Sequence, residues 1–173
     1  MTDDPETTAA LLRRLCAAQY LGVLATEGAG RPYTSLVAFV ASEDLRYLYF
    51  ATPRATRKYA NLIAHPEAAM HIDDRANRPA DIQGAISVTA LGRVAETAGA
   101  AREEAEQLYL SKQPHLAEFV AAPGCALMRM EVEAYVAAGF QRAVEWRPDR
   151  PHPLAHPATP LTRTQTHCPR DAP

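Results

Sequence analysis

The stretch Thr52-Pro53-Arg54-Ala55-Thr56-Arg57-Lys58-Tyr59-Ala60-Asn61-Leu62 places three cations at the start of an expected helix. Thr52 is a suitable N-cap and Pro53 a favoured first helical residue. The residue before a proline is pushed out of the helical region, so we expect this helix to cover 53–64 and end before Pro66. Arg54, Arg57 and Lys58 then fall in its first two turns and share one face.

This placement of charge is unfavourable unless an anion is bound. A helix N-terminus carries roughly half a positive charge and prefers acidic neighbours by about 0.3–1 kcal/mol each. A phosphate reverses the balance, because free N–H groups, the hydroxyls of Thr52 and Thr56, and the three cations can all act on it. The sequence therefore predicts a phosphate site at this helix. A solvated basic face stays open as the alternative.

Short strand-like segments separated by turns lie on both sides of this helix. The expected strands cover 20–26, 32–42, 46–51, 68–73 and 85–94, with one strand or a pair of strands within 125–140. Helices are expected over 7–19 and 98–120, the second broken near Pro114, and 74–83 is expected to be a loop. Such tight connections require antiparallel neighbours, and closure of the sheet removes exposed edges. The sequence predicts a mainly β (α+β) fold, a small closed barrel with flanking helices.

The bulk composition fits one globular domain. The chain has 173 residues and a formal charge of −2, so nucleic acid and anionic membranes are not attracted globally and any anion needs a local cluster. The odd cysteine count and the acidic N-terminus argue against a disulfide framework and a signal peptide, and a cytoplasmic location is expected. We expect the domain to cover 1–146. Residues 147–173, which hold seven of the 14 prolines (148, 151, 153, 157, 160, 169 and 173), are expected to form a flexible tail.

The helix segment and its flanks resemble a known family. Thr56-Arg57-Lys58, Leu62 and His65-Pro66 are similar to the Ser-Arg-Lys…Leu…Asn-Pro signature of the pyridoxamine 5′-phosphate oxidase-like split-barrel flavoproteins. Residues 47–52, 31–37 and 85–94 resemble the strands that precede and follow that signature. The match in element order covers roughly residues 8–146. The resemblance implies a six-stranded antiparallel split β-barrel with flanking helices.

The resemblance also implies FMN bound at the interface of a homodimer. Arg57 and Lys58, with Arg54, would neutralise the FMN phosphate, and Thr52 and Thr56 would donate hydroxyls. Residues along the flavin ring would be Thr34, Ser35, Leu36 and Val37. Looser assignments, some of them contributed by the partner subunit, are Gln83, Ser87, Gln141 and Trp146.

The sequence also departs from the true oxidase. That enzyme has an Arg-x-Val-Leu-Leu-Lys strand and a late Arg-Leu-His-Asp-Arg segment for its phosphorylated substrate, and neither is present here. His65 replaces the usual Asn. The resemblance therefore implies an FMN-dependent oxidoreductase that acts on a different, unknown small molecule. The alternatives are a deazaflavin-dependent reductase of the same fold and a non-catalytic flavin- or haem-binding protein.

A flavin carries the electron chemistry itself, which explains why no catalytic dyad or triad stands out in the sequence. His71 and Asp73 share one side of an expected strand, but two ligands make a poor metal site, and none is expected. Asn77 and Asp81 precede the strand at 85–94 and either shape the loop or cap a pocket over the flavin. Tyr109, Phe119, Cys16 and Cys125 are expected to be core residues.

Overall fold

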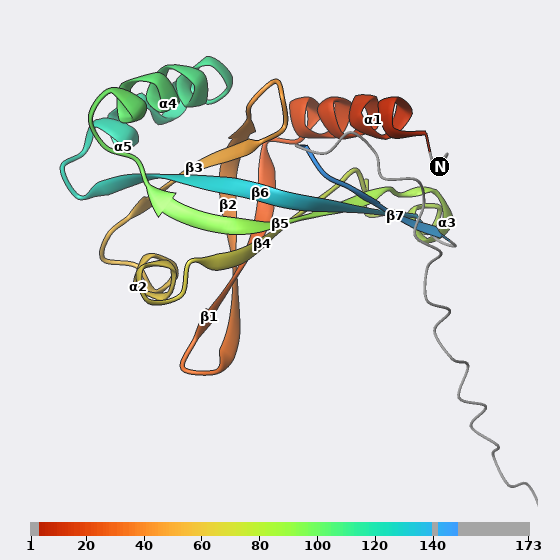
Figure 1. Ribbon diagram of the computed structural model, residues 1–173, viewed down its shortest axis with the longest axis horizontal. Coiled ribbons are helices and arrows are strands. Elements are labelled where there is room, and N and C mark those ends of the chain that lie inside the picture. The colour runs from red at the N-terminus through yellow and green to blue at the C-terminus, as the bar shows by residue number, and fades with distance from the viewer. Residues whose placement is uncertain (1–3, 140–141, 149–173) are drawn as a thin grey trace, which may run out of the picture.

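The computed structural model describes residues 4–139 and 142–148, which form a closed antiparallel β-barrel (Figure 1). Its strands in this part of the chain are β1 (Leu21–Gly28), β2 (Arg31–Ala41), β3 (Tyr47–Pro53), β4 (Glu67–Asp73), β5 (Ser87–Glu96), β6 (Cys125–Gly139) and β7 (Arg142–Trp146). They are ordered β3-β2-β1-β4-β5-β6-β7, and pairing of β3 with β6 closes six of them into the barrel. The mainly β split barrel predicted from the sequence is confirmed.

The split arises at the long strand β6. Its first half, Cys125–Glu131, pairs with β3, whereas its second half, Tyr135–Gly139, pairs with β7. On its other side β6 pairs with β5 along the whole length of β5, with a register irregularity between Leu91 and Gly92. The sequence left open one strand or a pair within 125–140, and the structure has one strand there, β6, with β7 following it from Arg142.

Alternation along the strands places one set of side chains inside the barrel. The core includes Leu24, Phe39, Phe50, Met70 and Tyr135, all fully buried. The Tyr135 hydroxyl donates to the Leu45 carbonyl at 2.8 Å, which satisfies its polar group, and burial raises its pKa. Cys16 and Cys125 are buried free thiols, as expected, and burial raises the pKa of Cys16 to about 11.

Helices flank the barrel. The described ones are α1 (Pro5–Ala18), α2 (Arg57–Ala64), α3 (Asp81–Gly84), α4 (Gly99–Lys112), the 3₁₀ turn η1 (Pro114–Leu116) and α5 (Ala117–Ala121). The helix α1 packs against β2, β4 and β7, while α4 and α5 cover the region where β3 meets β6 (Figure 1). Lys112 Nζ donates to the carbonyls of Cys16 and Gln19 and ties the end of α4 to the end of α1.

Three local expectations were wrong. The four-residue helix α3 lies at the end of the stretch expected to be a loop, because its turn is closed by backbone bonds onto Arg78, Pro79 and Ala80. Phe119 is 36% exposed on α5, although Tyr109 is buried as expected. The helix over 53–64 begins later, at Arg57.

Most of the predicted tail, residues 149–173, lies outside the described residues, as does Gln141. Within the described part of the chain, no helix has the length and apolar character needed to cross a bilayer.

Candidate functional site

The helix α2 begins at Arg57, later than the sequence predicts, and this leaves Arg54 outside the helix. Thr56, not Thr52, is the N-cap: its Oγ1 accepts from the backbone N–H of Tyr59 at 3.4 Å. Thr52 is 1% exposed within β3, because pairing between β3 and β6 continues to Pro53. Its Oγ1 still lies 3.0 Å from the Thr56 hydroxyl, so both hydroxyls belong to the helix entrance.

Two of the three predicted cations remain at the helix N-terminus. Arg57 and Lys58 are the first two residues of α2, and the Arg57 guanidinium lies over the Tyr33 ring, 4.9 Å from its centroid. The Lys58 side chain is half-buried and makes no ion pair with the described residues. Arg54 lies in the turn before the helix, and its side chain is bound to Glu96 instead of joining the other two cations. The prediction that all three cations share one helical face is therefore wrong.

Arg54 is bound to an acidic residue at the end of β5. Its Nη2 donates to Glu96 Oε1, and its Nη1 donates to the Pro123 carbonyl at 2.8 Å. Glu96 also accepts from the Tyr59 hydroxyl at 2.7 Å. The hydrogen bonds from Arg54 and Tyr59 hold the pKa of Glu96 below its usual range. This network neutralises one cation and fixes α2 against β5, and no local sequence signal pointed to it because its partners are far apart in the chain.

The buried side of α2 is fixed by a second set of contacts. Asn61 is 8% exposed and donates from Nδ2 to Thr26 Oγ1 at 3.0 Å, and Thr26 in turn donates to the Tyr33 carbonyl. A Cβ at Gly28 would lie 2.3 Å from Asn61 Oδ1, so a glycine there makes room for the amide. The helix that carries Arg57 and Lys58 is thus held rigidly against β1 and β2.

The predicted flavin-ring residues on β2 divide between its two faces. Thr34 and Leu36 are exposed on the outer face, whereas Ser35 and Val37 point to the inner face. Ser35 shares that inner face with Tyr33, the ring beneath Arg57. The Ser35 hydroxyl oxygen is buried and has no hydrogen-bond partner in the described structure. A buried hydroxyl without a partner is energetically costly.

A phosphate monoester fits this entrance. The N–H groups of the first turn of a helix lack intrahelical partners, and here they adjoin Lys58, Arg57 and the two threonine hydroxyls. The unpartnered Ser35 hydroxyl lies on the inner face of β2, which it shares with Tyr33. FMN ends in such a phosphate. The residues gathered here are Thr52, Thr56, Arg57 and Lys58.

The remaining predicted residues lie elsewhere in the chain. Ser87 is at the opposite end of β5 from Glu96, and Gln83 is exposed on α3. Trp146 on β7 packs on Tyr135, with ring centroids 5.9 Å apart. One chain does not bring these residues to α2. Their contacts with a cofactor stay predictions, as does any direct contact from Arg54, which would first have to leave Glu96.

The outer face of the sheet is unusually apolar, a feature that was not predicted from the sequence. Leu36 is 62% exposed, Leu21 50% and Leu91 41%, and Val23 and Ala25 lie between them on β1. The alternation of Leu21, Val23 and Ala25 was the available signal, because the intervening residues face the core.

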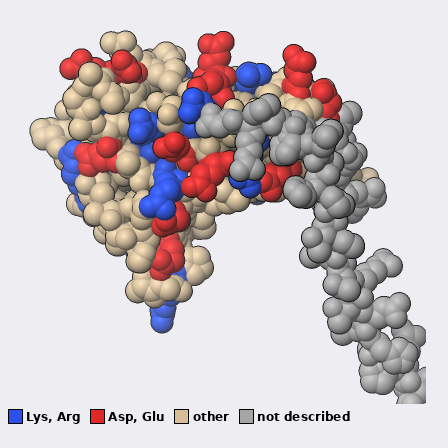
Figure 2. Space-filling model, viewed as in Figure 1, with Lys and Arg blue, Asp and Glu red and all other residues tan. Residues whose placement is uncertain are grey.

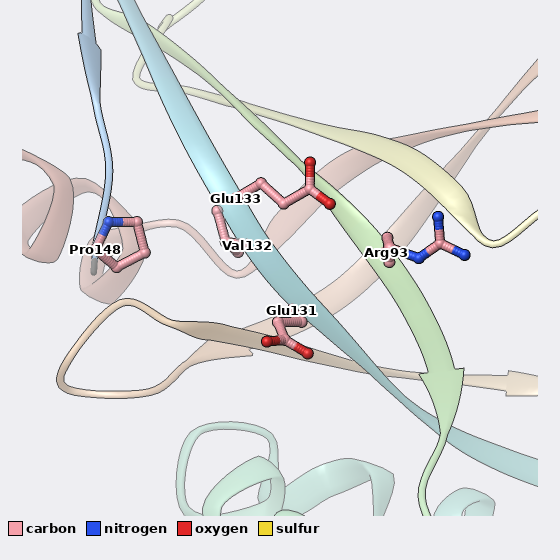
Figure 3. Close-up of a pocket in the computed structure, with 5 residues that line it drawn as sticks. All are labelled: Arg93, Glu131, Val132, Glu133 and Pro148. Carbon is pink, nitrogen blue, oxygen red and sulfur yellow. The ribbon is translucent and has the colours of Figure 1, made fainter. Parts of the chain in front are cut away.

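A different hollow, of about 250 Å³, is lined by Arg93, Glu131, Val132, Glu133 and Pro148. Figure 3 shows Glu131 and Glu133 on β6 beside Arg93 on β5. Arg93 is already paired with Glu67, so the hollow offers carboxylates and does not suit a phosphate. Acidic and basic side chains are interspersed over the visible surface (Figure 2), and in the described residues no three His, Cys, Asp or Glu side chains gather as a metal site.

Solved structures share this architecture. A heme-binding protein from Mycobacterium smegmatis matches with a TM-score of 0.72 and 18% identity over 81% of this chain and 57% of that chain. A FAD-binding protein from Mesorhizobium loti matches with a TM-score of 0.59 and 19% identity over 74% and 92% of the two chains. A protein from Clostridium acetobutylicum is related to general stress protein 26, of the pyridoxinephosphate oxidase family. It matches with a TM-score of 0.64 and 12% identity over 82% of this chain and 95% of that chain.

At these identities the structural likeness shows the fold alone, and this chain spans just over half of the mycobacterial protein. No curated protein sequence matches it. The family model described as pyridoxamine 5′-phosphate oxidase, however, matches residues 8–137, which include the barrel from β1 to β5, the helix α2 and most of β6. The chain therefore belongs to the pyridoxamine 5′-phosphate oxidase family.

Proposed function

We propose that this protein is an FMN-dependent oxidoreductase that acts on a small molecule as a homodimer. The observation that carries the proposal is the entrance of α2, where Arg57 and Lys58 adjoin a helix N-terminus and the hydroxyls of Thr52 and Thr56. Family membership supports a flavin, as does the structural likeness to the FAD-binding protein from Mesorhizobium loti.

The chain's own residues would hold the phosphate and position the cofactor. Lys58, which makes no ion pair within residues 4–139 and 142–148, would supply a charge-assisted bond, and Arg57 would supply a second from its place over Tyr33. The backbone N–H groups of the first turn of α2 would complete the set. When bound, the flavin supplies hydride or electron transfer, and the protein supplies binding, orientation and electrostatics around it.

Flavin titration of the purified chain tests the proposal. FMN should bind at least about tenfold more tightly than riboflavin, since the phosphate bonds contribute more than the 1.4 kcal/mol that a factor of ten requires. Quenching of flavin fluorescence measures both affinities. Failure of both ligands to bind would contradict the proposal. A haem spectrum in the protein as isolated would instead favour the alternative suggested by the mycobacterial heme-binding protein.

The homodimer is proposed from the exposed apolar face formed by Leu21, Val23, Ala25, Leu36 and Leu91. A contiguous apolar area of this kind is uncommon on a monomer. A second copy seated there could also bring its own Ser87 and Trp146 towards the flavin, which a single chain does not do.

Leu36→Glu should convert the dimer to a monomer, because it would bury a charge within that face. Light scattering is expected to give twice 18.9 kDa for the unmodified chain and 18.9 kDa for the variant. Ile63→Glu is the matched control: Ile63 is 59% exposed on α2, and this substitution should leave the dimer intact. A monomeric unmodified chain would refute the dimer.

A further inference from the structure

The Glu96 carboxylate at the end of β5 binds two residues that lie on either side of the N-cap of α2. Its Oε1 accepts from Arg54 Nη2, in the turn before the helix, and its Oε2 accepts from the Tyr59 hydroxyl, in the first helical turn, at 2.7 Å. The side chains of Arg54 and Glu96 are 40% and 25% exposed. Solvent therefore reaches this ion pair, and pairs of this kind contribute little to stability.

Apart from this carboxylate, a neutral carbonyl holds the Arg54 guanidinium. Its Nη1 donates to the Pro123 carbonyl at 2.8 Å. The pKa of Glu96 is lowered first by the hydrogen bond from Arg54, and Arg102 on α4 adds a smaller Coulombic effect. Arg102 is itself bound, since its Nη2 donates to the Val120 carbonyl at 3.0 Å. Within residues 4–139 and 142–148, Glu96 is thus the acidic partner that keeps Arg54 in place.

The turn that carries Arg54 also joins the two hydroxyls of the proposed phosphate entrance. Thr52 precedes Arg54 and Thr56 follows it, and their hydroxyl oxygens lie 3.0 Å apart. By its place in the chain Arg54 is a third cation of this entrance, although its side chain lies with Glu96. Three adjacent cations at a helix N-terminus would be unfavourable without an anion, and Glu96 relieves that repulsion.

We propose that Glu96 is a specificity-determining residue of the phosphate site, because it keeps Arg54 away and limits the site to two cations. This inference rests on the proposed FMN function. With Glu96 in place, the phosphate meets Arg57 and Lys58 alone. Without it, a change of rotamer would bring the Arg54 guanidinium from the turn to the phosphate. Glu96 thus sets the preference of the site for FMN over riboflavin, which has no phosphate.

Glu96→Ala should strengthen FMN binding by about tenfold at low salt, which is the effect of one additional charge-assisted hydrogen bond. Riboflavin affinity should not change, so the gain is confined to the ligand that carries the phosphate. The gain should shrink as ionic strength rises, because salt screens charges that solvent reaches. Fluorescence titration with each flavin measures both affinities.

A double variant separates the release of Arg54 from the loss of a nearby negative charge. In Arg54→Ala/Glu96→Ala, FMN affinity should stay within about threefold of that of the unmodified chain, because both charges are absent. Glu96→Gln should give part of the gain, since its amide oxygen accepts from Arg54 without a charge. Tyr59→Phe removes the other hydrogen bond to Glu96 and leaves Arg54 in place, so FMN affinity should stay within about twofold.

Glu67→Ala is the matched control. Glu67 also pairs with an arginine, Arg93 on β5, but it begins β4, which follows the end of α2, so it lies away from the entrance. Release of Arg93 should leave FMN affinity within about twofold of that of the unmodified chain.

An unchanged or weakened FMN affinity in Glu96→Ala would overturn the inference, as would a gain of about tenfold that survives in Arg54→Ala/Glu96→Ala. If FMN does not bind the unmodified chain, the proposed function fails, and inorganic phosphate becomes the probe. Its titration, followed through the backbone amide NMR signals of the first turn of α2, should still show tighter binding in Glu96→Ala. Equal or absent phosphate binding in the two proteins would overturn the inference independently of FMN.

Discussion

Replacing Arg57 and Lys58 together by alanine is expected to weaken FMN binding by at least about 100-fold. Each charge-assisted hydrogen bond contributes about 1.5–3 kcal/mol, and 1.4 kcal/mol corresponds to a factor of ten. Fluorescence titration measures the loss. The free energy of unfolding should change little, because Arg57 is exposed and Lys58 makes no ion pair in the described structure.

Arg54→Ala is the matched control. It also removes one positive charge close to α2, but this guanidinium is already bound to Glu96 and the Pro123 carbonyl. FMN affinity should therefore fall by less than about fivefold, the modest effect expected of a charge that acts only at a distance. A loss as large as that of the double variant would mean that Arg54 leaves Glu96 for the phosphate.

Gly92→Ala should destabilise the barrel by about 3 kcal/mol, the upper range for forcing an extra group into a packed interior. A Cβ at Gly92 would lie 2.0 Å from the Glu131 carbonyl oxygen and 2.9 Å from its carbon. These are backbone atoms of β6 at the irregularity between β5 and β6, so the clash cannot be relieved by turning a side chain. Urea denaturation measures the loss.

Gly84→Ala provides the comparison for this substitution. A Cβ at Gly84 would meet nothing within 4 Å, so the free energy of unfolding should stay within about 0.5 kcal/mol. Equal stability of the two variants would show that β6 can shift to accommodate the methyl group at Gly92.

The barrel and the helix α2 were predictable because their signals are local, whereas the phosphate site at α2 stays a prediction. Short strands joined by tight turns require antiparallel pairing, and a cationic helix start indicates an anion. The exact start of α2 was not predictable in the same way. Thr52 and Pro53 have the residue types of a helix entrance, yet they are the last residues of β3 because they pair with Ala126 and Cys125, far along the chain.

The position of the Arg54 side chain was not predictable for the same reason, because it depends on a partner far along the chain. Spacing alone groups it with Arg57 and Lys58, but Glu96 approaches only after β5 has crossed the barrel. The burial of the unpartnered Ser35 hydroxyl is another long-range result, since the inner face of β2 is covered only in the closed barrel.

The long strand β6 has a consequence for how the chain is made. The free edge of β3 is covered only by the first half of β6, and β7 needs the second half. A ribosome must therefore synthesise α2, β4, β5 and the α4–α5 helices before the sheet can close. Until then the nascent chain exposes an unpaired strand edge next to the proposed phosphate site, where intermolecular pairing competes with folding. Completion of β6 thus sets the earliest moment of synthesis at which the proposed cofactor site can form.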